Sequence, residues 1–166
     1  MRWIPAYVGL GSNLQDPPRQ VHRALAALAT LPSTRLVCQS SLYGSKPFGP
    51  VAQADFCNAA AGLLTQLDAE ALLAALRDLE ISLGREPVRE RWGPRVIDLD
   101  LLVYGSERRS SAALTLPHPG IAERSFVLRP LCDFAPDLIV PGVGRVADLA
   151  AKLPAADLWA IEPARH

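Results

Sequence analysis

Two aspartates within an apolar strand pattern are the feature that most constrains how this chain can fold. Segment 95–104 alternates in polarity: every second residue from Ile97 to Val103 is aliphatic, and Asp98 and Asp100 occupy positions between them. Side chains two residues apart on a strand point to the same face. This strand must therefore bury one face in a core and present both carboxylates on the other. Because neighbouring carboxylates repel each other, the pair needs a cation close by.

Arginines and a tryptophan precede this strand. Arg91 and Arg95 bracket a Trp-Gly-Pro triplet that begins at Trp92, and Arg85 opens the same loop. Carboxylates that hold a hard metal ion and arginines that bind phosphate oxygens are the parts of a phosphoryl-transfer site. Simpler interpretations stay open for each group. The aspartates fit a wet edge strand, the arginines a solvated loop, and the tryptophan a loop anchor.

The hydrophobic periodicity along the chain predicts one fold class. Strands are expected at 3–10, 34–43, 56–64 and 95–104, and helices at 17–32, 69–83, 124–134 and 146–153. Asp16 and Asp68 are the expected caps of the first two helices. The order strand, helix, strand, strand, helix, strand predicts an α/β (α+β) protein with a ferredoxin-like βαββαβ core, an antiparallel-rich sheet covered by helices. We expect one domain over residues 1–166, with long functional loops at 44–54 and 85–94.

Charge and composition narrow the partners. The formal net charge is zero, so general attraction to nucleic acid or to an anionic membrane surface is not expected. No apolar run is long enough to span a membrane. The three cysteines are far apart in sequence, which favours free thiols in a reducing cytoplasm. We expect a cytoplasmic monomer that acts on small molecules.

Three further segments carry candidate functional residues. The glycine-rich segment 9–14 lacks a glycine at its sixth position and is interpreted as a tight strand-to-helix turn that lines a pocket. Phe56 and Asn58 share one face of a strand, where a carboxamide is suited to the edge of a heterocycle. His118 stands between two prolines, six residues before Arg124, and is either structural or a phosphate donor.

These motifs together resemble the 6-hydroxymethyl-7,8-dihydropterin pyrophosphokinase family of the folate pathway. The strongest match is segment 91–102, Arg-Trp-Gly-Pro-Arg-x-x-Asp-Leu-Asp followed by two leucines. The flanking matches, in order along the chain, are Gly-Leu-Gly-Ser-Asn at 9–13, Phe-Gly-Pro at 48–50, Asp-Phe-Cys-Asn-Ala-Ala at 55–60, Pro-His-Pro at 117–119 and Glu-Arg-Ser-Phe-Val-Leu at 123–128. The resemblance covers about residues 5–150.

The resemblance implies a reaction and a role for each motif. The reaction is transfer of pyrophosphate from ATP to 6-hydroxymethyl-7,8-dihydropterin, with release of AMP. Asp98 and Asp100 would bind two Mg²⁺ ions and act in catalysis with Arg85 and Arg95. The implied ATP contacts are Glu80, Arg91, Trp92, Leu101, Thr115, His118 and Arg124. The implied pterin contacts are Ser45, Phe48, Phe56, Asn58 and Phe126. Trp92 would travel on a lid over the site.

Some positions depart from the family pattern. Pro87 stands where the family commonly has a second arginine, Phe56 where tyrosine is frequent, and Ser45 where threonine is common. Two other functions are weighed against this one: a metal-dependent phosphodiesterase acting on nucleic acid, and a non-catalytic nucleotide-binding module. The neutral charge disfavours the first, and the intact aspartates disfavour the second.

Overall fold

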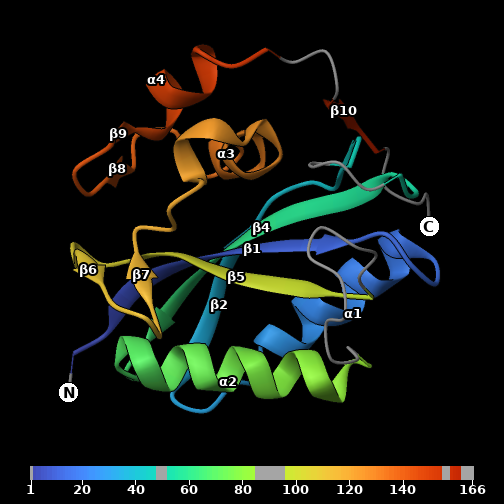
Figure 1. Ribbon diagram of the computed structural model, residues 1–166. Helices are drawn as coiled ribbons and strands as arrows, with labels where there is room; N and C mark the ends of the chain where they lie inside the picture. The colour runs from blue at the N-terminus through green and yellow to red at the C-terminus, as the bar shows by residue number, and fades with distance from the viewer. Residues whose placement is uncertain (1, 48–51, 85–95, 155–157, 162–166) are drawn as a thin grey trace.

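A six-stranded antiparallel sheet forms the centre of the molecule (Figure 1). The computed structural model describes residues 2–47, 52–84, 96–154 and 158–161. The strand order is β10-β3-β4-β1-β5, and β2 pairs with β4 farther along the same edge as β3. The strands are β1 Ile4–Ser12, β2 Thr34–Gln39, β3 Tyr43–Ser45, β4 Phe56–Thr65, β5 Asp98–Tyr104 and β10 Leu158–Ala160. This order is the one that the predicted ferredoxin-like core requires.

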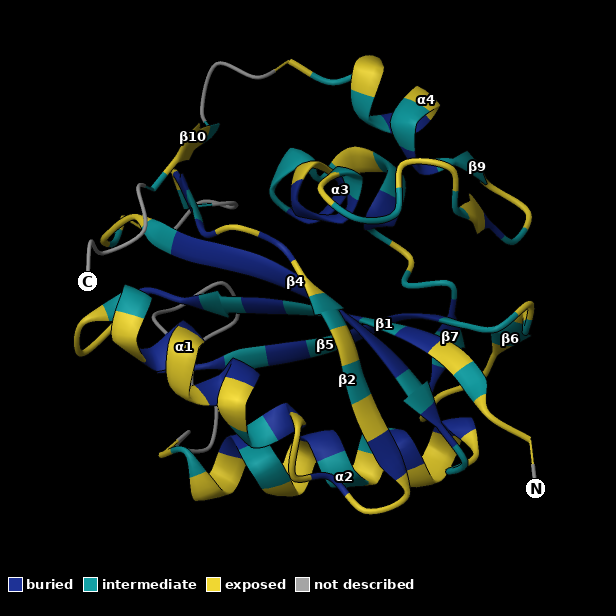
Figure 2. Cartoon of the chain, turned by 180° about the vertical axis from the view of Figure 1, so that it is seen from behind, coloured by how far each residue is buried: buried dark blue, intermediate teal, exposed yellow. Residues whose placement is uncertain are grey.

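Helices cover both faces of the sheet (Figures 1 and 2). On one face lie α1 (Pro17–Leu28) and α2 (Ala69–Ser82), and on the other η1 (Ile121–Glu123), α3 (Ser125–Cys132) and α4 (Val146–Ala151). Two small hairpins complete the structure: β6 (Arg109–Ser110) with β7 (Thr115–Leu116), and β8 (Ile139–Val140) with β9 (Gly144–Arg145). Each face therefore has its own hydrophobic cluster.

The strand alternation sorts side chains between these two clusters. Leu99 and Leu101 of β5 pack with the α1 and α2 side, and Leu102 packs with the α3 and α4 side. On β4, Ala59 and Ala61 join the first cluster and Ala60 joins the second. The aspartates, at the start of β5, share the strand face of Leu102.

Local expectations are partly confirmed. Asp68 caps α2, because its Oδ1 accepts the Ala71 N–H at 2.7 Å. The expected cap at Asp16 is wrong: this residue has φ 65° and makes no capping side-chain bond. The expected strand 34–43 is two strands, β2 and β3, which pair with different parts of β4. Segment 9–12 is not a turn, since β1 continues to Ser12.

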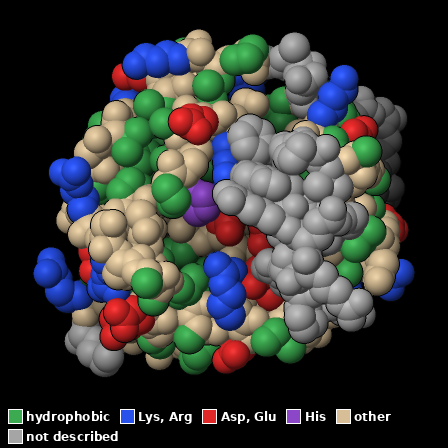
Figure 3. Space-filling view, in the orientation of Figure 1, with side chains coloured by type: hydrophobic (Ala, Val, Ile, Leu, Met, Phe, Trp, Pro, Cys, Tyr) green, Lys and Arg blue, Asp and Glu red, His purple; other side chains and the backbone are tan. Residues whose placement is uncertain are grey.

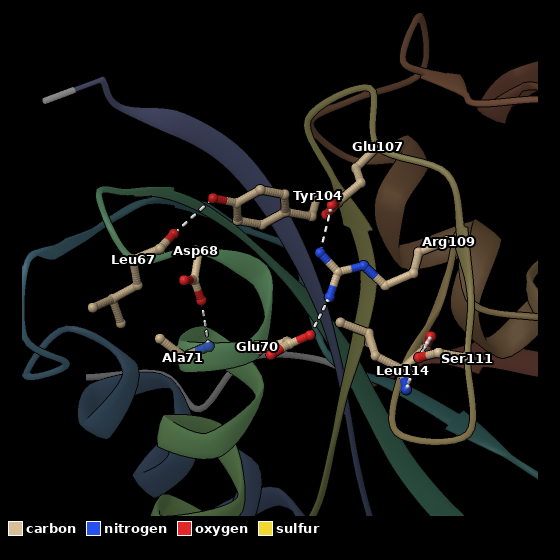
Figure 4. A network of polar contacts seen from close by, with 9 residues as sticks. All are labelled: Leu67, Asp68, Glu70, Ala71, Tyr104, Glu107, Arg109, Ser111 and Leu114. Carbon is tan, nitrogen blue, oxygen red and sulfur yellow. Dashed lines mark hydrogen bonds and ion pairs between the residues drawn. The ribbon is translucent and has the colours of Figure 1, made fainter.

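The polar segment 105–113 includes strand β6, and the β6–β7 hairpin contacts the start of α2. Arg109 donates to Glu70 of α2 at 2.8 Å and to Glu107 at 2.7 Å (Figure 4). The Tyr104 hydroxyl donates to the Leu67 carbonyl at 2.7 Å just before that helix. β7 lies beside β5, so the hairpin stands next to the strand that carries the aspartates.

Two global expectations can be compared with this structure. In the described part of the chain, no helix is long and apolar enough to cross a membrane. Cys38, Cys57 and Cys132 are all free thiols, as the sequence predicts.

Candidate active site

The candidate site lies on the face of the sheet shared by Asp98, Gly11 and Asn58, which we call the site face. Backbone pairing sets Asp98 of β5 opposite Gly11 of β1, and Gly11 opposite Asn58 of β4. Neighbouring strands are spaced by roughly 4.8 Å, so Asp98 and Asn58 stand about 10 Å apart with one glycine between them. The row therefore has an acidic end, a floor without side chains, and an amide end.

The acidic end consists of Asp98 and Asp100. Burial, and next the neighbouring Asp98 carboxylate, raise the pKa of the Asp100 carboxyl from 3.8 to about 7. Arg77 and Arg124 lower this pKa without cancelling the rise. Within the described residues, no group of three or more His, Cys, Asp and Glu side chains is placed to hold a metal. Two neighbouring carboxylates fit a hard divalent cation that takes its other ligands from water and phosphate.

A half-buried ion pair fixes the backbone between the two aspartates. Glu80 of α2 is fully buried and accepts the Leu99 N–H at 2.7 Å. Arg77, one turn earlier, donates to Glu80 at 2.8 Å and to the Leu99 carbonyl at 2.8 Å. Because Leu99 lies between Asp98 and Asp100, these three bonds fix the peptide units from which both carboxylates project.

His118 and Arg124 form a basic group beside the aspartates. The Leu102 carbonyl accepts the His118 backbone N–H at 2.8 Å, which ties this segment to β5. His118 Nδ1 accepts the Gly120 N–H at 3.1 Å, so the neutral ring carries its proton on Nε2. Burial, and next the Arg124 cation, lower the pKa of His118. The residue is therefore a neutral Nε2–H donor at physiological pH.

The surface around these groups has the same charge pattern. Figure 3 shows acidic side chains and a histidine set below their surroundings, with basic side chains on either side. The electrostatic influence of Arg77 and Arg124 on Asp100 agrees with that view. Such a mixture of carboxylates and cations suits a ligand that carries phosphates and a metal ion.

The amide end is built by Asn58 and Ser45. Both side chains are buried, and Asn58 Nδ2 donates to Ser45 Oγ at 2.6 Å. Asn58 Oδ1 lies above Gly11, 3.4 Å from where a Cβ on that glycine would stand. Since the bond to Ser45 holds the amide group, its acceptor oxygen is directed over the bare floor of the site face.

Phe56 and Phe126 lie on the same side of the sheet as Asn58. Phe56 is two residues before Asn58 on β4, and Phe126 in the first turn of α3 packs against the cluster that contains Ala60. The guanidinium carbon of Arg124 is 5.9 Å from the centre of the Phe126 ring. This contact joins the basic group to the aromatic side of the site.

The remaining candidate residues divide into two groups. The Leu101 side chain is buried in the α1 and α2 cluster, on the strand face opposite the aspartates. Because β5 is an edge strand, a contact of Leu101 with ATP would have to use its main chain. Thr115 is partly exposed on β7, beside β5. The other candidates, with the lid segment 85–94, lie outside the described residues: Phe48, Arg85, Arg91, Trp92 and Arg95.

One residue that sequence reasoning did not single out, Arg77, belongs to this site. Its only signal is its spacing of three residues before Glu80 on a helix. Its role depends on which helix and strand meet, which local sequence does not specify. Gly11 lies in segment 9–14, which was expected to line a pocket, but it belongs to strand β1 and not to a turn.

The fold and the site define a ferredoxin-like enzyme with paired carboxylates, a basic group and an amide pocket across one sheet. The sequence model of the 7,8-dihydro-6-hydroxymethylpterin-pyrophosphokinase (HPPK) family matches residues 7–136 of this chain. The chain belongs to this family, and it is a pyrophosphokinase, an ATP-dependent diphosphotransferase.

Relatives support this assignment along most of the chain. It is 46% identical over 149 residues to the 2-amino-4-hydroxy-6-hydroxymethyldihydropteridine pyrophosphokinase of Pseudomonas aeruginosa, covering 89% of this chain and 91% of that protein. The enzyme of the same name from Haemophilus influenzae is 44% identical over 149 residues, covering 90% and 92%. A wild-type Plasmodium falciparum HPPK-DHPS structure has TM-score 0.69 at 13% identity, covering 91% of this chain and 41% of that one. The chain thus spans less than half of that solved chain, and this likeness supports the fold.

Proposed function

We propose that the site face transfers a pyrophosphoryl group from ATP to the hydroxymethyl oxygen of 6-hydroxymethyl-7,8-dihydropterin. The observation that carries this proposal is the row of Asp98, Gly11 and Asn58 across three strands. It sets a metal-type carboxylate pair and a heterocycle-type amide about 10 Å apart. That separation suits a bicyclic acceptor whose short alcohol arm reaches a phosphate.

Asp98 and Asp100 are proposed to hold two Mg²⁺ ions. Their oxygens are the hard ligands that Mg²⁺ prefers, and burial together with the neighbouring Asp98 carboxylate raises the pKa of Asp100, so a bound cation would stabilise its charged form. When bound, the ions supply charge neutralisation at the phosphate oxygens. The Arg77–Glu80 pair keeps the two carboxylates in register through the Leu99 peptide.

The nucleotide is proposed to lie along the basic side of the site. His118 would donate to a phosphate oxygen from Nε2, and Arg124 would add a positive charge. Both residues interact with the aspartates, since Arg124 lowers the pKa of Asp100 and Asp98 influences the pKa of His118. By family resemblance, the other ATP contacts come from Glu80, Arg85, Arg91, Trp92, Arg95, Leu101 and Thr115. The carboxylate of Glu80 is already bonded to Leu99 and Arg77, and this favours a positioning role for it.

The pterin is proposed to stack between Phe56 and Phe126, with its polar edge on Asn58. An aromatic ring on each face provides dispersion contact, and Asn58 Oδ1 accepts from a ring N–H or amino group. Ser45 orients the amide, and Phe48 completes this side by family resemblance. The acceptor alcohol then attacks the β-phosphorus in line, the bond to the α-phosphate oxygen breaks, AMP leaves, and the alcohol proton passes to solvent. Alignment and charge neutralisation carry the rate enhancement.

The test is production of AMP from ATP with and without the pterin, in Mg²⁺ and in EDTA. Pterin-dependent AMP, lost in EDTA and in Asp98→Asn, supports the proposal. AMP or ADP formed equally without pterin refutes it, and binding without turnover indicates a nucleotide-binding module. Cleavage of plasmid DNA in Mg²⁺ would instead support a phosphodiesterase.

We also propose that residues 1–166 form one domain, and that the protein is a cytoplasmic monomer that does not bind nucleic acid. The single central sheet, with helices on both faces, supports the first part. Sedimentation equilibrium at micromolar concentration tests the monomer, and a dimer mass would refute it.

A further inference from the structure

Two glycines of β1, Gly9 and Gly11, lie in the middle of the sheet. Glycine in a strand interior is unfavourable, because the unfolded chain loses more freedom and no side chain packs. Neither residue has the positive φ found at the glycines of the turns. The backbone conformation of β1 therefore does not require glycine at either position.

The surroundings of the two glycines differ. A Cβ on Gly9 would meet the Leu102 side chain at 3.4 Å, which is ordinary contact with a core residue. A Cβ on Gly11 would meet Asn58 Oδ1 at 3.4 Å and Phe56 Cδ1 at 3.7 Å. Both neighbours of Gly11 belong to the proposed pterin pocket, and neither is close enough to exclude a methyl group. The protein itself thus leaves room for alanine at residue 11.

We propose that Gly11 is a specificity-determining residue, whose missing side chain is the space taken by the acceptor. The flat heterocycle lies across β1, with its polar edge on Asn58 and its alcohol arm directed to the aspartates. A methyl group at residue 11 would stand in the plane of approach and cover the acceptor oxygen of Asn58. This inference rests on the proposed function and adds to it the floor of the acceptor subsite.

The variant that tests this role is Gly11→Ala, with Gly9→Ala as its matched control. Both substitutions add one methyl group to the same strand and face, and we expect both proteins to fold with thermal midpoints at or above that of the wild type. Gly11→Ala should weaken pterin binding by about tenfold or more, as expected for overpacking of a fitted site. Binding of a non-hydrolysable ATP analogue with Mg²⁺ should change by less than about twofold, because its contacts lie beyond β1. Gly9→Ala should leave both affinities near those of the wild type.

Wild-type pterin affinity in folded Gly11→Ala, or equal losses in both glycine variants, overturns the inference. A second measurement uses the wild-type protein and does not depend on the variants. In amide NMR spectra, pterin should shift the Gly11 resonance well beyond that of Gly9, and equal or absent shifts overturn the inference. Pterin-dependent AMP production by the wild type is measured in parallel. Its absence defeats the proposed function, whereas its presence with unchanged Gly11→Ala binding defeats this inference alone.

Discussion

Replacing Glu80 by glutamine separates the structural and the nucleotide-binding interpretations of this residue. Glu80 Oε2 accepts the Leu99 N–H at 2.7 Å, and Oε1 accepts from Arg77 at 2.8 Å. Glutamine keeps one acceptor oxygen, so its NH₂ group must face either the Leu99 N–H or Arg77, both of which are donors. The variant therefore loses one bond and leaves a donor without a partner next to the aspartates.

The expected loss of stability follows from these two contacts. A hydrogen bond to a charged group contributes about 1.5–3 kcal/mol, and a buried donor left without a partner costs a similar amount. The Arg77 side chain is 45% exposed, so water compensates part of its loss. We therefore expect about 2 kcal/mol of destabilisation. For a chain of this length, that corresponds to a fall of about 4–8 °C in melting temperature.

The measurement is calorimetric unfolding of the ligand-free protein, paired with titration of a non-hydrolysable ATP analogue. Glu70→Gln is the matched control, because Glu70 lies on the same helix and pairs with Arg109 at an exposed position (Figure 4). Loss of that surface pair in Glu70→Gln should leave the melting temperature almost unchanged. Unchanged stability of ligand-free Glu80→Gln, together with weakened nucleotide binding, would refute the positioning role.

Two further predictions concern the ends of the site. Burial raises the pKa of Asp100 to about 7, so the native state binds more protons than the unfolded chain between pH 4 and 7, and stability falls as pH rises through that range. Urea unfolding in EDTA at pH 8 should show that Asp100→Asn is more stable than the wild type by about 1–3 kcal/mol, and this difference should vanish near pH 3. The variant should lack transferase activity. Equal stability of the two proteins at pH 8 would contradict this account. Phe126→Ala should weaken pterin binding by about 1–3 kcal/mol in calorimetry, by analogy with base–aromatic stacking, and barely change binding of the ATP analogue. Equal losses for both ligands would show that the pocket is misplaced.

The sequence predicts the main elements because their signals are local. Alternation in segment 95–104 places Asp98 and Asp100 on one face, and helical spacing places Val21, Leu25 and Leu28 in the core. The sequence also indicates which side of the sheet each apolar face packs against, because the split βαβ order of elements allows few arrangements.

The missed features depend on contacts between distant segments. The break between β2 and β3 has no Gly or Pro to announce it. At this break, the Ser40 hydroxyl accepts the Ala60 N–H at 2.9 Å, and the Ser41 N–H donates to Asp133, 92 residues away, at 2.9 Å. Asp16 matches the composition of a cap, yet the chain turns there through a left-handed conformation that points its side chain elsewhere. Local patterns do not encode either outcome.

Two departures from good folding rules coincide on the site face. Asp100 places a second carboxylate in a partly buried position beside Asp98, and Gly11 leaves a central strand without a side chain to pack. Each lowers the stability of the ligand-free protein, one through charge and the other through lost contact. Natural sequences concentrate such violations at functional sites. A cation would relieve the first and a flat ligand would fill the second, and backbone pairing places Gly11 directly opposite Asp98. The two defects are therefore complementary to the two halves of one ternary complex, which is why a stabilising change at either position should be bought with lost transfer activity.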